Sequence, residues 1–121
     1  MGASATGFPL LPAGYTAGTI TIAAGQANVP QNLLTLIQQQ LDINVQGSGY
    51  EIQLQTDNSG NVFIGNATTI GGPLSSTNYG YQLFQGGASR TYRSGFPGSH
   101  SSVQDLQVLM TAVGTFHVEI T

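Results

Sequence analysis

The 121-residue sequence contains no cysteine, no lysine and no tryptophan, and charged residues make up only 6% of it. The absence of cysteine excludes disulfides, thiolate metal sites and cysteine nucleophiles. Arg90 and Arg93 are the only permanently positive side chains, too few for a surface that binds nucleic acid or an anionic membrane. No apolar run approaches the ~18 residues of a membrane span. We therefore expect neither a nucleic acid nor a membrane as a partner.

Glycine and uncharged polar residues take the place of the missing charges, with 17 glycines and a formal net charge of only −3. An apolar fraction of 40% is enough for one modest core in a single domain, and it excludes a disordered composition. Small domains that stay alone in solution usually carry more charge. The composition therefore indicates permanent contact with other proteins. An extracellular β domain with a surface of amides and hydroxyls is the alternative.

Two stretches show the alternation of apolar and polar residues that is typical of strands. In residues 49–65, two alternating segments flank the turn formers of residues 56–60, which predicts a hairpin. Residues 106–120 repeat the pattern around a tight connection, which predicts a second hairpin. Two hairpins with one apolar face each indicate two sheets packed face to face. The predicted fold class is all-β, a β-sandwich of jelly-roll type with one short helix.

The rest of residues 17–121 completes a single domain of six to eight short strands. The one helical signal is Val29–Leu41, where Pro30 suits the first helical position and large apolar residues recur at helical spacing. The long connection at residues 66–78 is of the kind that is often functional. Further strands are predicted from β-branched and aromatic residues at 17–24, 79–85 and 90–94.

Residues 1–16 are predicted to form an extended N-terminal arm, because glycines and prolines interrupt any regular element there. Four large apolar side chains would anchor this arm, either on a neighbouring subunit or along its own domain. These predicted interface residues are Phe8, Leu10, Leu11 and Tyr15.

Arg90, Tyr92 and Arg93 are predicted as polar interface contacts, because arginine and tyrosine are enriched in interface hot spots. If residues 90–94 form a strand, a spacing of three places the two arginines on opposite faces. One arginine would pair with Asp105 or Glu119 and the other would reach a neighbouring protein. Two solvated loop charges are the alternative.

No motif in the sequence carries a specific chemistry. Residues 57–61 resemble a calcium loop only faintly, lack its closing glutamate and predict a turn. The two histidines, His100 and His117, have no third ligand at metal-binding spacing, and His117 falls on the exposed face of its strand. No Gly-x-Ser-x-Gly motif or spaced carboxylate pair marks an active site. We therefore expect no catalytic residues, no metal, no cofactor and no enzymatic activity.

Three features give the chain a resemblance to small virion proteins of tailed bacteriophages. They are the apolar segment Phe8–Pro12, the uncharged connection at residues 71–78 and the closing β pattern LQVLMTAVGTFHVEI at residues 106–120. The resemblance implies a β-sandwich or jelly-roll decoration (cement) protein on the capsid surface of the virion. It also implies a homo-oligomer, often a trimer, that binds the major capsid protein and bridges neighbouring capsid subunits. Decoration proteins have no catalytic residues to carry over.

The alternative function is a binding module, a tail or fibre β-sandwich that recognises a host-surface glycan. Such sites present aromatic rings beside polar groups in one cluster. The residues that would form the cluster are Tyr79, Tyr81, Tyr92 and Phe96.

Overall fold

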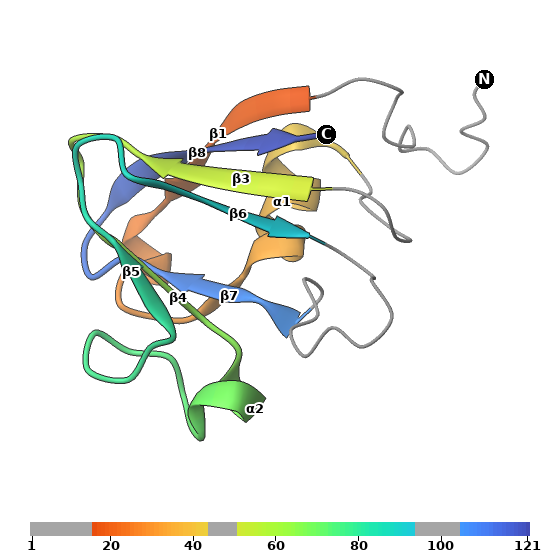
Figure 1. Cartoon of the computed structure of the whole chain (residues 1–121). Coiled ribbons are helices and arrows are strands. Elements are labelled where there is room, and N and C mark those ends of the chain that lie inside the picture. The colour runs from red at the N-terminus through yellow and green to blue at the C-terminus, as the bar shows by residue number, and fades with distance from the viewer. Residues whose placement is uncertain (1–15, 44–50, 94–104) are drawn as a thin grey trace.

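The computed structural model describes residues 16–43, 51–93 and 105–121, and Figure 1 shows how their helices and strands are arranged. The four predicted arm anchors, Phe96 and His100 lie outside the described residues. The strands are β1 (Thr16–Ile22), β2 (Gln31–Asn32), β3 (Glu51–Thr56), β4 (Val62–Gly65), β5 (Tyr81–Leu83), β6 (Ser89–Arg93), β7 (Gln107–Leu109) and β8 (Gly114–Ile120). The helices are α1 (Leu33–Leu41) and α2 (Ala67–Ile70), with a 3₁₀ turn η1 at Ala24–Gln26.

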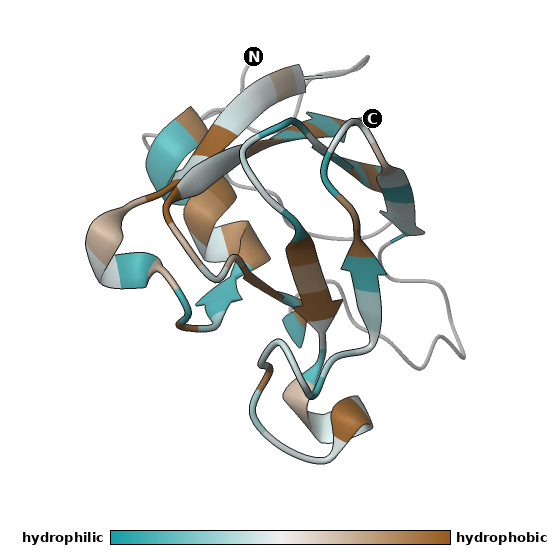
Figure 2. Cartoon of the chain, turned by 90° about the vertical axis from the view of Figure 1, so that its left-hand side faces the viewer, coloured by the Kyte–Doolittle hydropathy of each residue, from teal (hydrophilic) through white to brown (hydrophobic). Residues whose placement is uncertain are grey.

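Two antiparallel four-stranded sheets pack face to face, which confirms the predicted all-β sandwich. The first sheet has the order β1-β8-β3-β6 and the second has the order β2-β7-β4-β5. They form the upper and lower layers of Figure 1, and the hydropathy colours of Figure 2 show apolar segments on strands of both layers and on α1 at their side. The main core consists of Ile20, Ile22, Leu33, Leu36, Ile37, Ile43, Ile52, Leu54, Val62, Ile64, Leu83, Leu106, Val108, Met110, Phe116, Val118 and Ile120.

The strands pair in a nested order along the chain. β1 pairs with β8, β2 with β7, β3 with β6, and β4 with β5. Two further ladders, β3–β8 and β4–β7, join these pairs into the two sheets. The first and last strands therefore lie side by side over their whole length, with Thr16 opposite Ile120.

Both predicted hairpins are wrong. β3 and β4 lie in different sheets, and so do β7 and β8, so the chain crosses between the layers at each of these connections. Alternation determines which face of a strand is buried. Two strands stacked across one core satisfy that pattern as well as two neighbours within a sheet do. The turn formers between β3 and β4 bend the chain, but they do not place the two strands side by side.

Helix α1 joins the main core and contacts the edge strands β1 and β2 of the two sheets. The predicted helix is confirmed, but it begins at Leu33 and not at Pro30. Asn32 is its N-cap, because the Asn32 Oδ1 accepts the N–H of Thr35 at 2.9 Å. The helix thereby closes one side of the sandwich.

The outer edge of β1 is held by the side chain of Gln40 from α1. The Gln40 Oε1 accepts the N–H of Thr21 at 2.7 Å, and the Gln40 Nε2 donates to the Thr21 carbonyl at 2.9 Å. The amide thus takes the place of a neighbouring strand at this residue. Further along β1, Gly18 makes room for the helix, because a Cβ there would lie 2.5 Å from Leu41 Cδ2.

A smaller cluster covers the other face of the second sheet. Phe63, which alternation assigns to the polar face of its strand, packs with Leu74 and Ile70 from residues 66–80. Tyr79 adds a ring contact, with its centroid 5.0 Å from that of Phe63. Every residue of β4 is consequently buried. The long connection, which carries α2 at the foot of Figure 1, therefore serves as a cover for this face.

Candidate functional site

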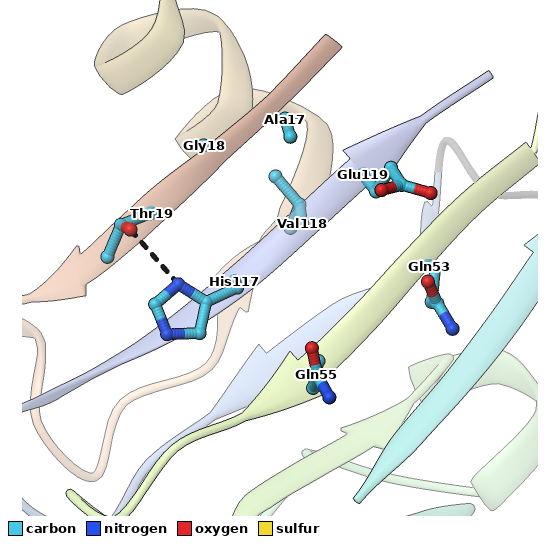
Figure 3. Close-up of a pocket in the computed structure, with 8 residues that line it drawn as sticks. All are labelled: Ala17, Gly18, Thr19, Gln53, Gln55, His117, Val118 and Glu119. Atoms are coloured by element: carbon cyan, nitrogen blue, oxygen red, sulfur yellow. Dashed lines mark hydrogen bonds between the residues drawn. The ribbon is translucent and has the colours of Figure 1, made fainter. Parts of the chain in front are cut away.

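The exposed face of the first sheet carries mostly uncharged polar side chains. Its register places Thr19, His117 and Gln55 in one row across β1, β8 and β3. A hollow of about 370 Å³ lies over this face, and Figure 3 shows the side chains around it. The residues that line the hollow are Ala17, Gly18, Thr19, Gln53, Gln55, His117, Val118 and Glu119.

A chain of polar contacts runs from the hollow to the turn after β3. Thr19 Oγ1 and His117 Nδ1 are hydrogen-bonded at 3.0 Å, and His117 Nε2 lies 3.3 Å from Asp57 Oδ2. The His117 side chain is 45% exposed, which confirms its predicted place on the outer face. The three residues come from β1, β8 and the β3–β4 connection, so their contacts tie three segments together.

Asp57 receives hydrogen bonds on both carboxylate oxygens. Its Oδ1 accepts the backbone N–H of Ser59 at 2.7 Å and the Ser59 hydroxyl at 2.5 Å, and its Oδ2 accepts the hydroxyl of Thr115. These bonds, from the Ser59 side chain first, lower the pKa of Asp57 from 3.8 to about 2. Partial burial opposes the shift, and the charge of His117 adds to it. The predicted turn is therefore confirmed, and its carboxylate fastens it to β8.

The order of hydroxyl, imidazole and carboxylate is that of a hydrolase triad. A nucleophile also needs N–H donors directed at the developing oxyanion. His117 and Gln55 lie on β8 and β3, which are interior strands with ladder partners on both sides. The backbone N–H groups of these strands are therefore engaged in the sheet. The arrangement orients the imidazole, and these two strands supply no oxyanion hole.

A second site lies between β6 and β5, the edge strands on the side that α1 does not contact. The guanidinium carbon of Arg90 lies 4.1 Å from the ring centre of Tyr81 and 5.3 Å from that of Tyr92. Cation–π contacts of this kind contribute roughly 0.5–1 kcal/mol at exposed sites. The three side chains border a groove of about 220 Å³, whose other lining residues are Ile64, Gly65, Asn66, Thr69, Ile70, Gly80 and Leu106.

Two glycines shape the floor of this groove. The N–H of Gly80 donates to the carbonyl of Ile64 at 2.9 Å, so the segment before β5 lies against the end of β4. A Cβ on Gly65 would lie 3.2 Å from Gly80 N and 3.2 Å from Ile70 Cδ1. Glycine at both positions therefore allows this close approach between the two segments.

The structure brings two of the three predicted polar contacts to the groove. Arg90 and Tyr92 face it, because their register partners on β3 are buried, and Arg93 is on the other face of β6. This confirms that the two arginines lie on opposite faces. Burial raises the pKa of Tyr92, and the charge of Arg90 opposes that rise. The phenol is therefore a neutral donor at physiological pH.

The prediction that one of the two arginines pairs with Asp105 or Glu119 is wrong, because no such ion pair forms among the described residues. The Nε of Arg93 lies 2.7 Å from the Oε2 of Glu51, the residue directly across the β3–β6 ladder. The β3–β6 register brings Arg93 and Glu51 together, so the pair cannot be predicted until the strand next to β6 is known.

Of the four aromatic residues predicted for a glycan site, the three that the structure describes divide between two contacts. Tyr81 and Tyr92 meet around Arg90, whereas Tyr79 packs on the ring of Phe63. The fourth, Phe96, lies outside the described residues.

Sequence reasoning missed the contacts among Thr19, His117 and Asp57. The alternation places Thr19 and His117 on the outer faces of their strands, which is a usable signal. The residues are far apart in sequence, however, and only the β1–β8 register brings Thr19 and His117 opposite each other.

No family model matches the chain, and comparisons with curated proteins and with solved structures give no match either. Within residues 16–43, 51–93 and 105–121, no helix is long and apolar enough to cross a membrane. The same residues contain no group of three or more histidine or acidic side chains that could hold a metal ion.

Proposed function

We propose that the chain is a non-enzymatic structural protein of a tailed-bacteriophage virion, which decorates the capsid surface and bridges neighbouring capsid subunits. The observation that carries this proposal is the Tyr81–Arg90–Tyr92 cluster. Tyrosine and arginine dominate the energetics of protein interfaces, and this cluster places three such residues together on exposed edge strands. The major capsid protein is the proposed partner, and a homo-oligomer, with three copies as the first expectation, is the proposed state.

The arrangement of strands supports the proposal at the level of the fold. We infer a jelly roll, because the nested pairing of β1 with β8 through β4 with β5 is the pairing of one long ribbon folded over on itself. Jelly rolls of eight strands are found in viral capsid and lectin domains. This support is an analogy of fold, so the function depends on the groove and on the assembly test below.

The proposed mechanism is additive. Each copy would contribute a small interface energy from its arm anchors and from the groove residues at a seam between subunits. A symmetric lattice repeats that contribution many times. Because such binding favours the assembled state, the sum would resist pressure from packaged DNA.

Copy number per particle tests the proposal. Quantitative mass spectrometry of purified virions would compare this chain with the major capsid protein. We expect many copies in a ratio that matches the capsid lattice. A handful of copies would place the protein on the tail or fibres, and absence from particles would refute a virion function.

Glycan binding is the second candidate function, and the hollow over the first sheet favours it. Gln53 and Glu119 border this hollow, and neither side chain has a hydrogen-bond partner among the described residues. Amides and carboxylates are suitable partners for sugar hydroxyls. A glycan array probed with the full chain, with Gln53→Ala as a matched variant, tests this function. Binding that the variant loses would favour it, and an array without signal would count against it.

A further inference from the structure

Arg90 is a cation whose described neighbours are aromatic rings. Arg93, three residues later, forms an ion pair with Glu51 at 2.7 Å. Among residues 16–43, 51–93 and 105–121, no ion pair joins Arg90 to a carboxylate. The two arginines of β6 therefore differ. The charge of Arg93 is paired within the fold, whereas the charge of Arg90 lies at the edge of the groove.

The aromatic contacts orient the Arg90 guanidinium and leave most of its donors unused. A ring packs against the flat face of the group, whereas its five N–H donors lie in the plane of the group. These donors form the planar fork that binds a carboxylate through two parallel hydrogen bonds. Because Tyr81 and Tyr92 hold the fork in advance, binding would cost less side-chain entropy.

The rest of the groove is mostly apolar, although Asn66 and Thr69 also line it. Ile64, Ile70 and Leu106 line it beside the guanidinium. The groove has a volume of about 220 Å³. A ligand that complements both its aliphatic lining and the charge of Arg90 therefore needs an aliphatic group next to an anion.

An acidic peptide segment fits this combination better than an acidic sugar does. A sugar needs polar partners for its hydroxyls, and the amide oxygen of Asn66 in the groove already accepts the N–H of Thr68 at 2.9 Å. The floor offers aliphatic carbon, which suits a leucine, isoleucine or valine side chain. The net negative charge of the chain does not prevent binding, because the local charge at the groove is that of Arg90.

We propose that the groove between β5 and β6 binds a segment of a partner protein in which an aspartate or glutamate is adjacent to an aliphatic residue. The carboxylate binds the Arg90 fork and the aliphatic side chain packs on Ile70, because Ile64 and Leu106 are almost fully buried in the core. The identification of the partner as the capsid protein rests on the proposed function, whereas the ligand chemistry inferred for the groove is independent of that function.

An NMR titration of the full chain tests the groove without any virion. The probe is N-acetyl-glutamyl-leucinamide at millimolar concentrations, and the matched probe is N-acetyl-glutaminyl-leucinamide. We expect the acidic probe to shift the amide signals of Gly65, Gly80 and Tyr81, and the neutral probe to bind at least about tenfold more weakly. Equal shifts with both probes, or no shift with either, would overturn the proposal.

Two variants on one strand separate the groove from the rest of the surface. Arg90→Gln should weaken binding of the acidic probe at least about tenfold, whereas Arg93→Gln should change it less than about twofold. Arg90→Lys keeps the charge, loses the planar fork and should lie between them. An unchanged amide spectrum elsewhere establishes that each variant folds. Equal loss in both glutamine variants would refute the role of Arg90, and shifts with N-acetylneuraminic acid in place of the peptide would refute the peptide ligand.

Particle binding distinguishes this inference from the proposed function. If virions contain the chain and Arg90→Gln joins them as well as the wild type does, the inference fails and the virion function stands. If virions do not contain the chain, the virion function fails, and the titration still decides what the groove binds.

Discussion

At the scale of single residues, Asp57 combines several structural roles. It fastens the β3–β4 connection to β8 through Ser59 and Thr115, and its Oδ2 also lies 3.3 Å from His117. The sequence indicates a turn here, because aspartate, asparagine, serine and glycine follow one another. The contact with β8 is invisible at that level, since it joins residues 58 positions apart.

Acid titration should reveal the contribution of Asp57 to stability. Because its folded-state pKa of about 2 lies below the unfolded value of 3.8, the stabilisation is fully present above the unfolded value. It is lost as the pH falls through about 2. The shift corresponds to at most about 2 kcal/mol after allowance for partial exposure. Asp57→Asn should lower the free energy of unfolding at neutral pH and reduce its dependence on pH in the acid range.

Urea denaturation at a series of pH values measures both effects. Glu119→Gln removes one negative charge from β8 and is the matched control. If Asp57→Asn retains the full acid dependence, the assigned hydrogen bonds do not stabilise the carboxylate form.

At the scale of elements, α1 both fills the core and blocks an edge. Its apolar spacing is readable in the sequence, and the helix was predictable for that reason. Its start was misplaced, because Asn32 competes with Pro30 as the signal for the first turn and the side-chain cap prevails. The role of Gln40 was not predictable. Three successive glutamines indicate a solvated face, and only packing against β1 selects one of them.

Gln40→Ala should destabilise the protein by about 1 kcal/mol, because it removes two hydrogen bonds to the backbone of Thr21. Gln39→Ala is the matched control on the same exposed stretch and should change the free energy of unfolding by less than about 0.5 kcal/mol. Thermal or urea unfolding compares the two. Equal effects would show that the Gln40 amide does not hold the edge of β1.

At the scale of the whole molecule, the nested strand order explains which predictions succeeded. Burial patterns in β3, β4, β7 and β8 were readable, so two packed sheets and one core were predicted correctly. The partners of those strands were not, because pattern alone does not choose between a neighbour in the sheet and a strand across the core. The cation–π cluster depends on the same missing information, since β5 and β6 belong to different sheets.

Nested pairing should also make folding slow. β1 and β8 join the two ends of the described fold, and such non-local pairs require loop closure before they stabilise the fold. We expect the main refolding phase in stopped-flow fluorescence of the tyrosines to take milliseconds to seconds. A main phase in microseconds would indicate that local contacts dominate folding.

The pairing of β1 with β8 has a practical consequence for protein engineering. Thr16 lies opposite Ile120, so a peptide joined before Thr16 and cargo fused after Thr121 leave the domain from the same corner.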